Sequence, residues 1–171
     1  MCDVRRPAWA EQTPAMRDYY DHYWGLPVHD DRQLFEMLSL ELFQAGLTWR
    51  TIWDRRQSFE HAFANFDVDR VAAFTAADID RLCQDKTIIR NRRKISAVVV
   101  NARDPGTTPG QQSFDDYVWR FVGYRPQRLI LTPTELLPAQ TAQSRASKAI
   151  QADGFKFVGP TIMYSFMTAV G

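Results

Sequence analysis

The sequence predicts an all-α protein, and two patterns support this. Apolar side chains recur at three- and four-residue spacings through most of the chain, which is the period of an amphipathic helix. No segment alternates apolar and polar residues cleanly enough to predict a half-buried strand. With 171 residues and a hydrophobic share of 45%, the chain can bury a core as one domain, or as two lobes that share a core.

Two helices are predicted in the first part of the chain. The first strong helix covers 31–45. Thr48, a good N-cap residue, can begin a second helix, which we expect to continue as one element to about Asn65. That helix would present a broad apolar face made of Trp49, Ile52, Trp53, Phe59, Ala62, Phe63 and Phe66.

Shorter elements are predicted in the middle of the chain. Asp67 begins a short helix, and the segment 75–78 has the S/T-x-x-D/E spacing of a capping box, so another helix starts there and ends near Gln84. A tight connection at 85–89 then leads into a helix at 90–103. The side chains of that helix expected to face the core are Ile95, Val98, Val99 and Ala102.

The last third of the chain contains the most loop-like sequence. The segment 104–110, rich in proline and glycine, is the best candidate for a boundary between lobes. A helix is predicted at 113–121, followed by an ordered but irregular connection at 126–143. A helix at 144–152 comes next, and Pro160 suits the first turn of a final helix.

Composition narrows the class of protein. The net charge is +1, so any DNA-binding surface must be local. Two cysteines, Cys2 and Cys83, form no disulfide framework, which favours a reducing cytoplasm. No apolar run approaches the length of about eighteen residues that a membrane span needs, and the amino terminus lacks the apolar core of a signal peptide. We therefore expect a cytoplasmic protein without membrane contacts.

Glu41 lies on the apolar face of its predicted helix. It follows Leu34, Met37 and Leu38 by seven, four and three residues, so all four side chains share one face. An unpaired buried carboxylate costs several kcal/mol, so something in the core must need it. The alternative is a structural glutamate that backbone amides or an arginine satisfy.

Aromatic residues surround Glu41 in the sequence. Gly46 ends the helix and Trp49 follows on the next turn, while Trp9 and Trp24 lie upstream. A buried acid beside aromatic faces suits a pocket for a planar, hydrogen-bonding, cationic ligand. The alternative for Trp49 is that it is simply the first core residue of its helix.

The segment of about 78–103 is predicted to form a helix, a short hairpin and a second helix. Five basic residues gather at the hairpin within nine positions, and such a device with outward-facing cations binds phosphates. The alternative is a solvated basic face. The five residues are Lys86, Arg90, Arg92, Arg93 and Lys94.

Three segments together resemble one family. They are YYDHYWGLPVHDDRQLFEMLSLELFQAGLTW, DIDRLCQDKTIIRNRRKISAVVVNAR and GFKFVGPTIMYSFMTAVG. They resemble the 3-methyladenine DNA glycosylase type I family of the helix-hairpin-helix glycosylase superfamily, from about Trp9 to Gly171. The resemblance implies a helix-hairpin-helix glycosylase-like helical bundle, with a single glycosylase domain over 1–171 and a base pocket between two helical lobes.

The resemblance also implies a function. Such enzymes turn a methylated adenine out of the DNA stack and hydrolyse its N-glycosidic bond. We expect double-stranded DNA containing alkylated purines as the substrate, free 3-methyladenine as the product, and a monomeric enzyme. Excision of 3-methylguanine is a further expectation.

Five residues of the pocket are implied by the family motifs. Glu41 corresponds to the carboxylate that recognises the purine, and Tyr19 to the tyrosine that hydrogen-bonds the base, so these two are the expected catalytic residues. Trp49 corresponds to the stacking tryptophan, with Trp9 and Trp24 as further pocket aromatics. Because a methylated purine is cationic, Glu41 and the ring faces favour it over neutral adenine.

Other positions are implied to contact the base or the DNA. Met16 stands where the family has a pocket tyrosine. Gln44, Gly46 and Leu47 belong to the turn that such enzymes press into the gap left by the extruded nucleotide. The resemblance also favours DNA binding by the five basic residues of the hairpin.

The chemistry that the family requires is modest, because N3 methylation makes the base a good leaving group. Superfamily relatives carry an aspartate that stabilises the cationic sugar, and this family lacks it. Asp104 and Asp116 are present here, but Asp104 lies in a loop segment and Asp116 at the start of a helix, so we assign that role to neither.

The family typically binds one zinc ion with two cysteines and two histidines. Pro7 and Tyr20 stand at the two amino-terminal ligand positions, and the other two would lie beyond Gly171. Cys2 is out of register, and His22 is not at a ligand position. We therefore predict no zinc and no other cofactor.

Two alternatives to the glycosylase remain. One is a catalytically weak DNA-binding or lesion-sensing relative with the same fold. The missing zinc ligands and Met16 favour it slightly, whereas the intact pocket residues oppose it: Glu41, Tyr19, Trp24 and Trp49. The other is a helical protein whose pocket binds a small cationic aromatic molecule, and the basic hairpin argues against it.

Overall fold

The computed structural model describes residues 6–104, 113–126 and 142–171. Within these ranges the regular structure is helical and contains no strand, which confirms the all-α prediction. The helices are α1 (Pro14–His22), α2 (Asp31–Gln44), α3 (Trp49–Trp53), α4 (Arg56–Ala62), α5 (Val68–Ala72), α6 (Ala76–Gln84), α7 (Arg92–Ala102), α8 (Phe114–Trp119), α9 (Ala142–Ala152) and α10 (Pro160–Ala169), with 3₁₀ turns at Ala64–Phe66 and Arg120–Val122.

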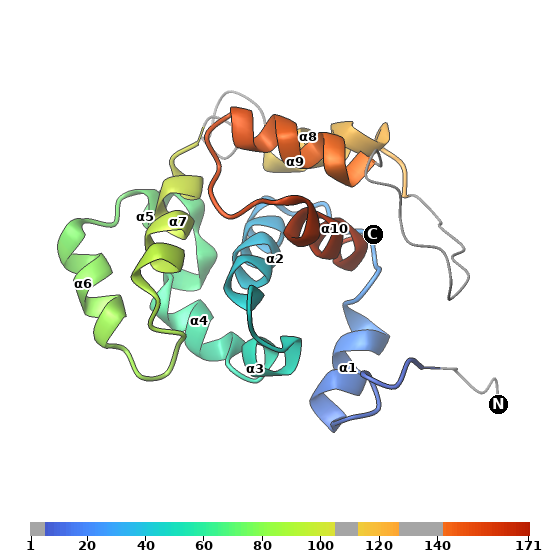
Figure 1. Ribbon diagram of the computed structural model, residues 1–171, viewed down its shortest axis with the longest axis horizontal. Coiled ribbons are helices and arrows are strands. Elements are labelled where there is room, and N and C mark those ends of the chain that lie inside the picture. Colours follow the sequence, from blue (N-terminus) through green and yellow to red (C-terminus); the bar gives the residue numbers. More distant parts are fainter. Residues whose placement is uncertain (1–5, 105–112, 127–141) are drawn as a thin grey trace.

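Helix α2 lies at the centre of the molecule. It packs against α3, α7, α8 and α10, and in Figure 1 it lies between α10 on one side and the helices α4 to α7 on the other. Every residue from Leu34 to Phe43 is buried. A helix that is covered all round buries its polar positions as well as its apolar ones. This is why Glu41, on the last full turn of α2, has little access to water.

Local capping signals determine where several helices begin. Thr48 accepts the Thr51 N–H at 3.3 Å, and Thr75 and Asp78 form the predicted capping box. Helix α1 was not predicted, although it has the same kind of signal. Thr13 accepts the Met16 N–H at 3.2 Å, and a proline occupies the first turn.

The prediction of one helix from Thr48 to about Asn65 was wrong. The chain leaves helical geometry at Arg55 (φ −105°, ψ 8°), so α3 and α4 are separate helices. Immediately after the break, the Arg56 Nε donates to Glu36 Oε1 at 2.7 Å, and the Glu36 side chain is 1% exposed. Arg32 Nη1 donates to the other oxygen, Glu36 Oε2, at 3.1 Å, so both oxygens of this buried carboxylate are paired.

Helices α6 and α7 form the predicted helix–hairpin–helix. Asn91 caps α7 through the Lys94 N–H at 3.2 Å, so this helix begins at Arg92, two residues later than predicted. Ile88 is buried and anchors the connection to the core. The core-facing residues of α7 are confirmed as Ile95, Val98, Val99 and Ala102.

Helix α8, with its 3₁₀ turn, and helices α9 and α10 confirm the predicted positions. The predicted loop at 104–110 and the irregular connection at 126–143 fall almost entirely outside the described residues. Among the residues that the structure describes, no helix combines the length and the apolar character needed to cross a membrane.

The end of α10 is joined to the segment that follows α1. The Gly25 N–H donates to the Ala169 carbonyl at 2.9 Å, and the Val28 N–H donates to the Val170 carbonyl at 3.0 Å. These bonds bring the last helix beside the first part of the chain, so that both contribute to one cavity.

Candidate active site

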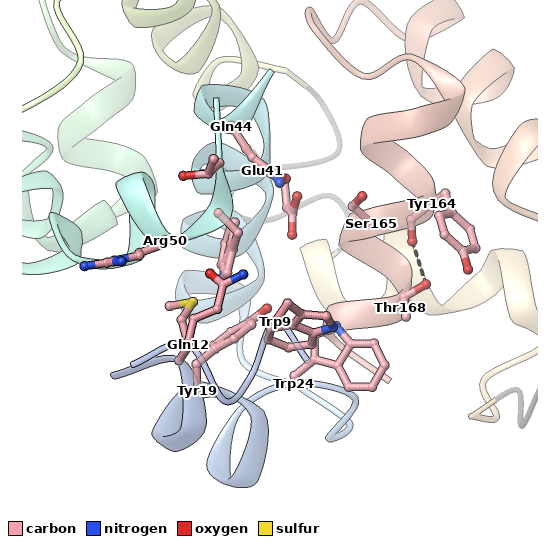
Figure 2. A pocket seen from close by; sticks show the side chains of 13 residues that line it. Trp9, Gln12, Tyr19, Trp24, Glu41, Gln44, Arg50, Tyr164, Ser165 and Thr168 are labelled. Carbon is pink, nitrogen blue, oxygen red and sulfur yellow. Dashed lines mark hydrogen bonds between the residues drawn. The ribbon is translucent and has the colours of Figure 1, made fainter. Parts of the chain in front are cut away.

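A cavity of about 420 Å³ lies between α1, α2, α3 and α10. Figure 2 shows its lining side chains, which come from the first fifty residues and from the last helix. All the base-contacting residues expected from the sequence line it, together with one residue of the turn after α2. They are Trp9, Met16, Tyr19, Trp24, Glu41, Gln44 and Trp49.

Glu41 brings a carboxyl group into this cavity. Its side chain is 4% exposed, and Oε2 has no hydrogen-bond partner within the described part of the chain. Figure 2 shows the carboxyl pointing into the open space between α1 and α10. Burial raises the pKa of Glu41 from 4.5 to about 8. The alternative of a fully satisfied structural glutamate does not describe this residue, whose buried oxygen faces a ligand-sized space.

Tyr19 reaches the same cavity from α1. Its ring centroid lies 5.2 Å from that of Trp49 and 4.4 Å from that of Trp53. Burial, and then the nearby Glu41 carboxylate, raise the pKa of Tyr19, while the charge of Arg56 lowers it. The net effect is upward, so at neutral pH the phenol remains protonated and can donate a hydrogen bond.

Trp49 occupies the first position of α3, directly after the Thr48 cap. Its ring stacks on Trp53 at 5.9 Å with an interplanar angle of 29°. Trp49 therefore packs against the core and also lines the cavity, so neither sequence interpretation excludes the other. Its Nε1 is buried without a partner among the described residues.

Trp9 and Trp24 form the remaining aromatic wall. Their ring centroids are 5.8 Å apart and meet edge to face. Tyr20 stacks on Trp24 at 5.5 Å and meets Trp9 edge-on at 5.5 Å. Tyr20 thus packs against both tryptophans without lining the cavity itself.

Six lining residues were not predicted from the sequence. Half of them come from α10. The sequence of this helix is part of the family resemblance, but no site residue was predicted in it. Ser165 and Thr168 are polar residues three apart on a largely apolar helix, and this spacing was the available signal. In Figure 2 the Thr168 hydroxyl donates to the Tyr164 carbonyl at 2.8 Å. The six residues are Gln12, Thr48, Arg50, Tyr164, Ser165 and Thr168.

The Gln44–Leu47 turn lies at the edge of the cavity. Ala45 has φ −49° and ψ 115°, Gly46 has φ +80°, and the Leu47 N–H donates to the Gln44 carbonyl at 2.7 Å. These are the features of a type II turn, which needs glycine at its third position. Leu47 is 39% exposed, so an apolar side chain projects from the surface beside the cavity.

Four of the five basic residues of the hairpin face solvent. Lys86 and Arg90 are exposed and have no ion pair within the described residues. Arg92 pairs with Asp80, and Arg93 lies 5.9 Å from the Phe157 ring. A positive surface therefore remains at the hairpin, although Asp80 offsets part of it.

Lys94 differs from the prediction that it points outward to phosphates. Its side chain is 6% exposed, and Nζ donates to the Phe43 carbonyl at 2.8 Å and to the Ala45 carbonyl at 2.5 Å. The last carbonyls of a helix have no partners within the helix and carry the negative end of its dipole. They attract the ammonium inward, and burial lowers the pKa of Lys94.

The residues at the two amino-terminal zinc positions of the family do not fit a metal site. Pro7 offers only a carbonyl, which accepts the Ala10 N–H at 2.9 Å, and Tyr20 is packed between rings. Within 6–104, 113–126 and 142–171, no three His, Cys, Asp or Glu side chains gather to hold an ion.

Comparison with known proteins matches this sequence and fold to one group. The family described as methyladenine glycosylase matches residues 9–171. DNA-3-methyladenine glycosylase 1 of Escherichia coli is 44% identical over 170 residues, which cover 98% of this chain and 91% of that protein.

Two solved structures are similar over nearly the same length. A crystal structure of 3-methyladenine DNA glycosylase I has a TM-score of 0.90 at 43% identity, covering 98% of this chain and 93% of the other. A tyrosine-to-phenylalanine variant of 3-methyladenine DNA glycosylase I, solved in complex with 3-methyladenine, has a TM-score of 0.87 at 34% identity, covering 96% and 89%.

Proposed function

The chain belongs to the methyladenine glycosylase family, and from this premise we propose how its cavity selects and releases the base. The protein excises 3-methyladenine from DNA by hydrolysing the bond between the base and deoxyribose. Our proposal assigns this reaction to the cavity between α1, α2, α3 and α10. The buried, unpartnered Oε2 of Glu41 is the observation that carries it.

Glu41 is the residue that recognises the cationic purine. Its carboxyl is held in a dry aromatic cavity, where it favours a ligand that supplies a hydrogen-bond donor and positive charge. A purine that lacks the methyl group supplies the donor without the charge. The cavity therefore binds the methylated base more tightly than ordinary adenine.

Aromatic side chains hold the plane of the base. Trp49 stacks on it, Tyr19 donates its phenolic hydrogen bond to it, and Trp9 and Trp24 close the far side. A stacking contact of this kind contributes about 1–3 kcal/mol per base. Met16, where the family has a tyrosine, supplies an apolar, adaptable contact to the cavity.

The bond that breaks needs little assistance. The electron pair of the glycosidic bond goes to the base, which leaves as neutral 3-methyladenine, and the sugar carries the positive charge until water adds at C1′ and loses a proton. Neither Asp104 nor Asp116 lines the cavity, so we assign no carboxylate to the sugar cation. Selective binding of the extruded base, with access for water, is the enzyme's main contribution.

The contacts with double-stranded DNA lie at the edge of the cavity and beyond it. Gln44, Gly46 and Leu47 enter the gap left by the extruded nucleotide, and four exposed cations of the hairpin contact phosphates: Lys86, Arg90, Arg92 and Arg93. Figure 1 shows the α6–α7 connection and α3 along the same edge of the molecule, which supports a continuous DNA-binding face. We propose further that the protein is a monomer with a single domain over 1–171 and that its pocket lies between two helical lobes. It binds no metal, and it acts in the cytoplasm, where the DNA is.

Release of free 3-methyladenine from methylated duplex DNA tests this proposal directly. The wild type should release the base, the Glu41→Gln variant should release it much more slowly, and both should unfold at similar temperatures. Release of 3-methylguanine in the same assay shows whether the range of substrates extends to it. A wild-type protein that binds methylated DNA without releasing any base would instead identify a lesion-sensing relative.

A further inference from the structure

Lys94 connects the basic hairpin to the turn after α2. Its backbone N–H donates to Asn91 Oδ1 at 3.2 Å in the first turn of α7, and its side chain passes inward to the carbonyls of Phe43 and Ala45. These two carbonyls lie on either side of Gln44. One buried ammonium therefore binds the backbone on both sides of Gln44, the first residue of the turn.

The bond to Ala45 has a specific consequence for the turn. Type I and type II turns differ mainly in the orientation of their central peptide, which here joins Ala45 to Gly46. The ammonium holds the Ala45 carbonyl on its own side. Because the N–H of a trans peptide points opposite to its carbonyl, the Gly46 N–H is directed away from Lys94. The bond thus selects the type II conformation in which Leu47 is exposed.

We propose that Lys94 is a positioning residue for the Gln44–Leu47 turn. Its ammonium fixes the conformation of this turn and the place of the turn relative to the basic hairpin. This inference rests on the proposed function, since it assumes that the turn enters DNA. A charge-assisted hydrogen bond is about twice as strong as a neutral one, and here two of them converge on one buried ammonium. Lys94 acts through the turn and touches neither base nor phosphate.

The test compares Lys94→Met, which keeps the length of the side chain and removes its charge and donors, with Arg90→Ala in the same hairpin. For Lys94→Met, excision from methylated duplex DNA should fall about 10- to 100-fold. Affinity for free 3-methyladenine, measured by tryptophan fluorescence, should stay within about twofold of the wild type. The slope of log affinity against log salt should remain that of the wild type, whereas Arg90→Ala should reduce it by about one.

A double-mutant cycle with Leu47→Ala separates positioning from general damage. If Lys94 acts through the turn, Lys94→Met should cost little further activity once Leu47 has been truncated. Additive losses would overturn the proposal, and so would a reduced salt slope, which indicates a phosphate contact. Loss of free-base binding in Lys94→Met would also overturn it, because the lysine would then hold the whole fold.

A measurement that does not depend on enzymatic activity tests the role of Lys94 separately from the proposed function. The carbonyl ¹³C resonances of Phe43 and Ala45 should shift in Lys94→Met and stay in place in Arg90→Ala. If the wild type releases no base yet these resonances shift as expected, the proposed function fails while the contact between Lys94 and the turn stands. Unshifted resonances would refute that contact whatever the activity.

Discussion

Glu41 and Trp49 each leave a buried polar atom without a partner among the described residues, and both side chains line the same cavity. The atoms are a carboxyl oxygen and an indole N–H. An unsatisfied buried group of this kind costs about 1–3 kcal/mol. A planar ligand with a donor for the first and an acceptor near the second would recover part of that cost, so the two atoms suit the cavity to such a ligand.

Glu41→Gln should weaken binding of free 3-methyladenine by about tenfold or more, because the amide cannot become an anion beside the base. Glutamine has the shape of the protonated carboxyl, so the melting temperature should be unchanged or slightly higher. A fluorescence titration and a thermal melt measure the two effects. Equal base affinity in the two proteins would remove Glu41 from the recognition site.

The stability of the wild type should depend on pH through Glu41. Its pKa is about 8 in the folded protein and near 4.5 when unfolded, so between these values the folded state binds more protons. The free energy of unfolding should therefore fall as pH rises through this window, by up to about 1.4 kcal/mol per pH unit. The stabilisation is fully present below about pH 4.5 and lost above about pH 8.

Urea unfolding of the wild type and Glu41→Gln across this window isolates the contribution of Glu41. The wild type should lose stability relative to the variant as pH rises, because all other titrating groups are shared. Parallel curves for the two proteins would mean that the Glu41 carboxyl is already ionised in the folded state.

Trp49→Ala should abolish most binding of 3-methyladenine while lowering the free energy of unfolding by less than about 3 kcal/mol, because the ring is only partly buried. Trp53→Ala is the matched control on the same helix. Its ring is buried behind the cavity wall, so truncation should cost about 3–5 kcal/mol of stability. Urea unfolding and fluorescence quenching by the free base measure both. If Trp49→Ala unfolds as easily as the control yet binds the base normally, Trp49 belongs to the core alone.

Arg90→Ala and Lys86→Ala should lower affinity for every duplex sequence about equally, and each should reduce the salt slope by about one. Lys148→Ala is the control, since this exposed lysine lies on α9, at the opposite end of the molecule from the hairpin in Figure 1. Binding titrations over a range of salt concentrations measure the slopes. A loss confined to one sequence would indicate base readout instead.

Removal of metal should leave the protein folded and active. Pro7 and Tyr20 cannot supply the expected cysteine and histidine ligands, so we expect folding to be independent of zinc. Circular dichroism before and after dialysis against a chelator should show the same helical signal. One zinc per chain by elemental analysis, or loss of helix on chelation, would contradict this expectation.

The sequence by itself determined the features that depend on neighbouring residues. Thr48, Thr75 and Asp78 cap helices because their side chains reach N–H groups only three residues away. Glu41 could be assigned to the buried face because helical periodicity holds over a few turns. The aromatic wall was expected from the abundance of tryptophan and from the family motifs, which also placed Tyr19 and Trp49 at the cavity.

Only the tertiary structure decided which distant groups meet. The sequence pattern of the hairpin predicted that Lys94 faces phosphate, but its partners Phe43 and Ala45 lie 51 and 49 residues away. The buried partner of Arg56, at the start of α4, is Glu36, 20 residues upstream. Periodicity and capping carry no information at such separations. These contacts form because a buried carbonyl or carboxylate needs a partner, and packing determines which charged side chain can reach it.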